Sequence, residues 1–177
     1  MSTVDFLRSI NLELDCDEPE RFLHFRPTSK SADLIEAVFQ AGRDRALMVV
    51  APYGSGKSLT AGYLVHAVQN EVKRFPGARK LLLAIAARLE EVRPPLAHAL
   101  RRRATAKDRR GVAVSLFGHH GLTLPSLVSA FQQAFQKVGL GREARAFDRI
   151  ELTSPSGAAE LIKTATEKLH ASGRDRI

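Results

Sequence analysis

The chain has 177 residues, of which 44% are apolar, so it is long enough to form one domain with a hydrophobic core. Its single cysteine excludes an internal disulfide, and no apolar run approaches the roughly 20 residues that span a bilayer. The formal net charge of +8 comes from 27 Lys and Arg against 19 Asp and Glu. No signal peptide is predicted, and we expect a cytoplasmic protein without a membrane segment.

The first half of the chain predicts an acidic lead-in, a helix, a strand and a second helix. Within the lead-in, 1–30, the acidic part to about residue 20 is expected to be poorly ordered or to form an outer strand, and a short extended piece with Phe22 and Phe25 follows it. Ser31 is a good N-cap for a helix over 31–41. An apolar run predicts a buried strand over 45–50, and helical spacing of apolar residues predicts a helix over 59–75, which a Pro-Gly pair ends.

The second half predicts one more strand and four helices. The most ambiguous segment is 81–92, because its apolar run is also typical of a buried strand, but the three–four–three spacing and the alanines favour a helix. The predicted strand is Val112–Phe117, and the predicted helices cover 81–92, 94–106, 123–138 and 156–170.

The segment between the first strand and the second helix, Ala51-Pro52-Tyr53-Gly54-Ser55-Gly56-Lys57-Ser58, has the form of a Walker A phosphate loop. Gly54 and Gly56 let the backbone curl so that its N–H groups point into one concavity, at the positive end of the following helix. Lys57 is expected to reach the β- and γ-phosphates, and the Ser58 hydroxyl to bind Mg²⁺.

We therefore predict binding of ATP with Mg²⁺, with Lys57 as the catalytic residue and Ser58 as the metal ligand. Tyr53 is expected either to shield a phosphate or to pack under it. The usual motif opens with glycine, whereas this chain has Ala51, a tolerated variant. The nucleotide-binding residues are predicted to be Tyr53, Gly54, Ser55, Gly56, Lys57, Ser58 and Leu59.

Hydrolysis also needs a carboxylate at the end of a buried strand, and no Asp or Glu after Ser58 follows four consecutive apolar residues. The chain ends with a helix, Gly173, a few polar residues and the β-branched Ile177, which is how an α/β unit enters its next strand. We therefore expect a domain cut off before the strand that carries the acid, with little or no hydrolysis on its own. The alternative is a natural small nucleotide-binding protein with a degenerate second motif.

The chain resembles the N-terminal half of an ATP-binding domain of the additional-strand P-loop class, which includes AAA+ and STAND ATPases. The stretch Phe25–Thr28 and the loop Tyr53–Ser58 resemble large bacterial ATP-binding proteins often found in phage-defence systems. The resemblance implies a three-layer α/β P-loop fold with a mostly parallel sheet, incomplete at its C-terminus and formed by residues 31–177. It also implies that Phe25–Thr28 lies near the adenine, and it is compatible with an oligomer and with ATPase activity once an acid completes the site.

The basic residues suggest an alternative function. Lys73–Arg110 contains twelve Lys or Arg against three acidic residues, so it accounts for the whole positive excess. This segment is either a surface that binds nucleic acid or an acidic protein partner, or a solvated helical face. The pair His119-His120 after the second predicted strand is either a polar loop or faces the nucleotide. A small kinase acting on a metabolite fits less well, because no acid is placed to activate an acceptor.

Overall fold

The computed structural model describes residues 10–39, 47–71, 75–105, 110–117, 123–151 and 156–174. Within these ranges every regular element is a helix, and none is a β-strand. The prediction of a three-layer α/β fold with a mostly parallel sheet is therefore wrong. The helices are α1 (Leu12–Asp15), η1 (Pro19–Phe22), α2 (Ser29–Phe39), α3 (Lys57–Gln69), α4 (Pro76–Leu89), α5 (Pro94–Thr105), α6 (Leu124–Lys137), α7 (Gly141–Ala144), η3 (Arg145–Arg149) and α8 (Gly157–Ala171).

The two segments predicted as strands have no regular secondary structure where the structure describes them. Residues 47–50 lie on the surface, with Met48 90% and Val50 85% exposed. Residues 112–117 cross between two groups of helices, with Val112 buried and Leu116 exposed. A strand gains its stability from a hydrogen-bonded neighbour and a covered face, and these segments have no ladder partner among the described residues.

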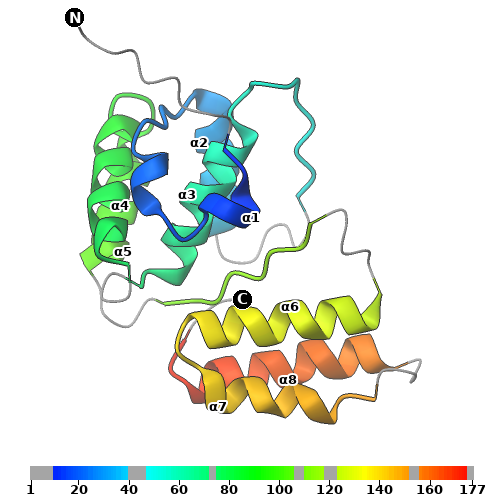
Figure 1. Cartoon of the computed structure of the whole chain (residues 1–177). Helices are drawn as coiled ribbons and strands as arrows, with labels where there is room; N and C mark the ends of the chain where they lie inside the picture. The colour runs from blue at the N-terminus through cyan, green and yellow to red at the C-terminus, as the bar shows by residue number, and fades with distance from the viewer. Residues whose placement is uncertain are drawn as a thin grey trace, which may run out of the picture.

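The first hydrophobic cluster surrounds α3, which α1, η1, α2, α4 and α5 cover (Figure 1). The α4–α5 hairpin makes the most extensive helix–helix contact of the molecule. The aromatic side chains Phe22, Phe25 and Tyr63 lie inside this cluster, and all three are at most 3% exposed. The predicted lead-in 1–30 therefore contains core residues, because η1 and the segment after it pack on α3 and α4.

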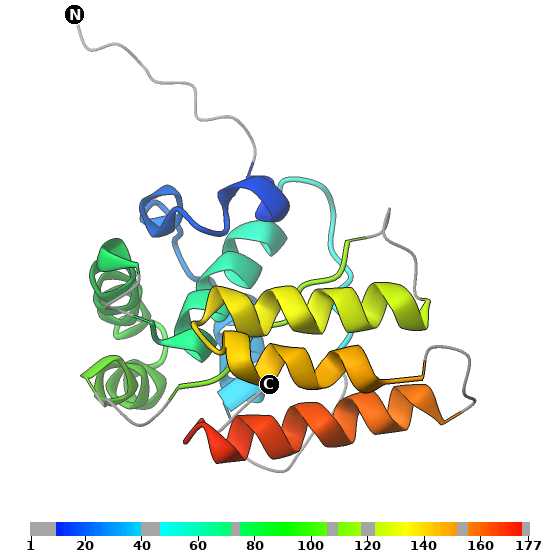
Figure 2. The same ribbon diagram turned by 60° about the horizontal axis from the view of Figure 1, so that its bottom comes forward.

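The second cluster is a small antiparallel bundle of α6, the α7–η3 run and α8, which lie side by side in Figures 1 and 2. Phe135 and Phe147 pack edge to face with ring centroids 5.1 Å apart, and Phe131 contacts Phe147 in the same way at 5.9 Å. Such aromatic pairs add a favourable quadrupole term to the area that they bury. The Thr123 side chain accepts a hydrogen bond from the Ser126 backbone N–H and caps α6, as an N-terminal threonine is expected to do.

Most predicted helices are confirmed to within a few residues: α2, α5, α6 and α8 correspond to 31–41, 94–106, 123–138 and 156–170. The helix predicted over 59–75 ends earlier, at Gln69, because Asn70 adopts a left-handed conformation and closes it with φ 49°. The Pro-Gly pair predicted to end this helix instead begins α4, since proline is well suited to a first helical turn.

Two further segments differ in part from what the sequence predicts. The segment predicted as helix over 81–92 is confirmed as helical but forms only the later part of α4. The polar stretch before residue 151 contains α7 and η3, which the sequence analysis did not predict. The loop with His119 and His120 and the strand expected at Ile177 lie outside the described residues.

A buried arginine joins the two clusters. The Arg174 guanidinium forms an ion pair with Glu71, directly after α3, and both side chains are at least nine-tenths buried. It also donates hydrogen bonds to the carbonyl oxygens of Gly111, at 2.9 Å, and Val138, at 3.0 Å. Glu71 follows α3, the central helix of the first cluster, and Val138 belongs to the second cluster, so this one side chain contacts both clusters and the crossing segment.

Candidate functional site

The loop before α3 has the backbone conformation that its glycines predict. Gly54 and Gly56 have φ values of 78° and 83°, in the left-handed region that favours glycine. No heavy atom lies within 4 Å of where a Cβ would stand at either position, so the space beside the loop is open. Ala51, which replaces the usual first glycine, does not have a positive φ, so this position does not require glycine.

Lys57 is the first residue of α3, and its side chain folds back across the loop. Its Nζ donates to the carbonyl oxygens of Ala51 and Pro52, both at 2.7 Å, and approaches the Ser55 Oγ at 3.4 Å. The ammonium therefore links the start of α3 to the start of the loop and places a positive charge against the loop backbone. Only the backbone of Ala51 takes part, which explains why alanine serves at this position.

The N-terminus of α3 has no side-chain cap. Its N-cap residue, Gly56, cannot supply one, and the first turn of the helix contains no acidic residue. The Gly56 carbonyl accepts hydrogen bonds from the backbone N–H of Thr60, at 2.9 Å, and from the Thr60 hydroxyl, at 3.0 Å, which begins the helical ladder. The first N–H groups of a helix and its dipole together favour an anion at this end.

The structure brings the predicted site residues together in one short surface loop. Tyr53 is 93% exposed, Ser58 is partly buried, and the partly buried Leu59 packs against the first cluster, so only its backbone faces the loop. Phe25, expected near the adenine by resemblance, is 3% exposed and packs against Tyr63 inside the core. The Phe25 ring is therefore not available to a base, although Arg26 and Thr28 beside it are exposed.

Most of the described basic residues between Lys73 and Arg110 already have partners within the chain. The ion-paired side chains are Arg93 with Asp33 and Glu36, Arg101 with Glu90, and Arg110 with Glu71. Arg88 donates to the carbonyls of Leu23 and Phe25, and the buried Arg103 donates to those of Ala67 and Val68. These partners favour a structural role for much of the segment. Lys73, Arg74, Lys107 and Arg109 lie outside the described residues.

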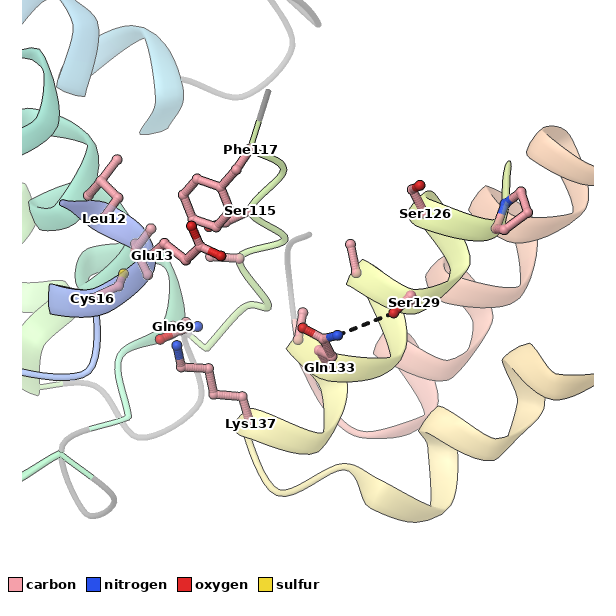
Figure 3. Close-up of a pocket in the computed structure, with 15 residues that line it drawn as sticks. Leu12, Glu13, Cys16, Gln69, Ser115, Phe117, Ser126, Ser129, Gln133 and Lys137 are labelled. Atoms are coloured by element: carbon pink, nitrogen blue, oxygen red, sulfur yellow. Dashed lines mark hydrogen bonds between the residues drawn. The ribbon is translucent and has the colours of Figure 1, made fainter. Parts of the chain in front are cut away.

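A separate cavity of about 660 Å³ lies between the two clusters, away from the phosphate loop (Figure 3). The face of α6 forms one wall, including Ser129, Gln133 and Lys137, and α1 and α3 form the other. Lys137 is ion-paired with Asp17, and Gln133 donates to Ser129, so these polar groups interact within the chain. This cavity cannot be predicted from the sequence, because its shape depends on how the two clusters face each other.

The Cys16 thiol lies at this cavity and is 8% exposed. Burial raises its pKa, the nearby Lys137 opposes this rise, and Asp17 adds to it. A raised pKa keeps the thiol protonated, so Cys16 lacks the thiolate character of a reactive cysteine.

The chain was compared with protein-family models, curated proteins and solved structures. No family model, curated protein or solved structure matches this chain. No helix in the described part of the chain is long and apolar enough to cross a membrane. The same residues contain no group of three or more His, Cys, Asp or Glu side chains that could hold a metal ion.

Proposed function

We propose that the chain binds a nucleoside triphosphate, with ATP as the expected ligand, through the loop Ala51–Ser58 and together with Mg²⁺. The observation that carries the proposal is the position of Lys57, whose ammonium is held over the loop by two carbonyl oxygens at 2.7 Å. Glycines in the left-handed conformation and an uncapped helix N-terminus accompany it. Together these features match the chemistry of a polyphosphate, which needs convergent N–H donors and a fixed positive charge.

The groups at the loop fit this ligand. They are a lysine ammonium, serine hydroxyls and backbone N–H groups, and the first turn of α3 adds no carboxylate that would repel a phosphate. The contact between Lys57 and Ser55, at 3.4 Å, is the longest of the three that the ammonium makes. A phosphate oxygen is expected to replace it, while the two shorter contacts keep the ammonium in place.

The proposed roles follow the chemistry of each residue. Gly54 and Gly56 keep the backbone close to the phosphates, and Lys57 neutralises the charge of the β- and γ-phosphates. The Ser58 hydroxyl would hold Mg²⁺, which when bound neutralises charge on the phosphate oxygens. Because neither the loop nor the first turn of α3 contains a carboxylate to orient water, we expect slow turnover or none. The resemblance to large bacterial ATP-binding proteins favours ATP and a role within a larger ATPase.

The test is calorimetry with Mg·ATP on the wild-type chain, Lys57→Ala and the matched control Lys80→Ala. Lys80 is an exposed lysine on α4. We expect Lys57→Ala to weaken binding by about 10- to 100-fold, because a charge-assisted contact to each phosphate is lost, and Lys80→Ala to leave it unchanged. Phosphate release in the same samples is expected to be negligible.

Equal loss of affinity in both lysine variants would indicate nonspecific charge attraction and contradict the proposal. Absence of wild-type binding would also contradict it, provided that circular dichroism shows the same helical content and melting in all three proteins. Rapid phosphate release would refute the expected lack of hydrolysis but leave the binding site intact.

A further inference from the structure

Tyr53 is the most exposed of the large hydrophobic and aromatic side chains among the described residues, at 93%, and it is the third residue of the loop Ala51–Ser58. The ring therefore does not pack under the loop, which was one of its two expected roles. The Tyr53 hydroxyl makes no hydrogen bond with another described residue, and the neighbouring Pro52 and Gly54 are also exposed. The hydroxyl of this tyrosine is therefore free to form a hydrogen bond with a ligand.

The contacts of Lys57 indicate which part of a bound nucleotide lies beside Tyr53. Its ammonium donates hydrogen bonds to the carbonyl oxygens of Ala51 and Pro52, so it lies against the first residues of the loop, next to Tyr53 in the sequence. The motif lysine meets the β- and γ-phosphates, whereas the loop N–H groups and the helix N-terminus hold the phosphates nearer the sugar. The terminal phosphate is therefore expected on the Ala51–Tyr53 side.

We infer that Tyr53 recognises the terminal phosphate, its hydroxyl donating a hydrogen bond to a γ-phosphate oxygen, so that the site prefers triphosphates to diphosphates. This inference rests on the proposed function and names a specificity residue within the same site. The tyrosine hydroxyl makes a charge-assisted hydrogen bond with the γ-phosphate of a triphosphate. A diphosphate has no γ-phosphate to accept this bond. Its effect is therefore on the ratio of the two affinities.

The experiment compares the binding of Mg·ATP and Mg·ADP by calorimetry in the wild type, Tyr53→Phe and Tyr53→Ala. Tyr53→Phe keeps the ring and removes only the hydroxyl. We expect it to weaken Mg·ATP binding about fivefold to tenfold and to change Mg·ADP binding less than twofold. Tyr53→Ala is expected to lose at least as much ATP affinity as Tyr53→Phe. Because the side chain is 93% exposed, neither substitution is expected to affect folding.

The outcomes separate this inference from the proposed function. If Lys57→Ala abolishes ATP binding while Tyr53→Phe leaves the ATP-to-ADP ratio at its wild-type value, the phosphate site stands and the role of Tyr53 is overturned. Equal losses for ATP and ADP in Tyr53→Phe would likewise overturn a contact specific to the terminal phosphate. If the wild type binds neither nucleotide, the proposed function and the inference that rests on it both fall.

Discussion

At the scale of single residues, burial strongly shifts the protonation equilibrium of His66. This side chain is 1% exposed and lies between the rings of Phe22 and Phe75, with centroids 5.8 and 6.0 Å away. Its Nε2 is buried without a hydrogen-bond partner among the described residues. Burial lowers the pKa of His66 to about 4, and the nearby Lys137 acts in the same direction. Weaker effects raise the pKa, from Asp17, Glu20 and the backbone of Cys16.

We predict that His66 makes the protein less stable in acid. The unfolded chain binds a proton at this residue near pH 6.5, whereas the folded protein does not until about pH 4, so stability is complete above 6.5 and falls between 6.5 and 4. The loss is on the order of 3 kcal/mol. Urea unfolding at pH 7, 6, 5 and 4 measures it, and His66→Gln should show a flatter dependence. An identical pH dependence in the variant would contradict this assignment.

At the scale of elements, α3 carries both the phosphate loop at its start and the centre of the first cluster along its length. Gly62 lets η1 approach this helix, because a Cβ at residue 62 would lie 2.0 Å from the Phe22 Cε1. Phe22 is fully buried, so its ring has little room to move. The glycine therefore serves a close approach between two elements and not a special backbone angle.

We predict that Gly62→Ala destabilises the protein by about 1–3 kcal/mol, because overpacking outweighs the gain in helix propensity. Gly141→Ala is the matched control, since Gly141 begins α7 and a Cβ there would meet no heavy atom within 4 Å. Thermal and urea unfolding of both variants would measure the difference. A Gly62→Ala protein as stable as the control would mean that η1 does not pack on α3 in this way.

At the scale of the whole molecule, the connection between the two clusters depends on few interactions. In the part of the chain that the structure describes, no helix of the first cluster forms an extensive contact with a helix of the second. The described polar contacts that join the two clusters include the Arg174–Glu71 pair, the Arg174 hydrogen bonds to Gly111 and Val138, and the Lys137–Asp17 ion pair. A buried ion pair adds little net stability over apolar packing, but removing Arg174 leaves the buried Glu71, among the described residues, with only its longer contact to the Arg110 guanidinium, at 3.9 Å.

We predict that Arg174→Met costs about 3–5 kcal/mol and that Arg174→Met combined with Glu71→Leu costs less than the sum of the single changes. Arg142→Met, at an exposed position on α7, should be neutral. Amide hydrogen exchange should show α6 and α8 losing protection relative to α3 in Arg174→Met. Uniform loss of protection across all helices would instead mean that the two clusters unfold as one unit.

The sequence predicted helices better than strands because a helix forms its hydrogen bonds within its own segment. The signals that predict a helix act within one segment, so they can be recognised without knowing the fold. They are the Thr123 cap of α6, the alanines of α4 and the periodic apolar residues of α8. The runs 47–50 and 112–117 show the opposite case. An apolar run becomes a strand only when a second segment pairs with it, and in the described residues that partner is missing.

The local geometry of the loop 51–58 was likewise determined by the sequence. The glycines at 54 and 56 allow a left-handed backbone, and the neighbouring Lys57 places its charge within reach of the loop carbonyls. Only the tertiary structure decided that Tyr53 points into solvent, that Phe25 is buried, and that Arg103 and Arg174 serve internal contacts. Local geometry depends on a few adjacent residues, whereas exposure and pairing depend on segments far apart in the chain. For this reason the sequence predicted a phosphate-binding loop but not the helical architecture that carries it.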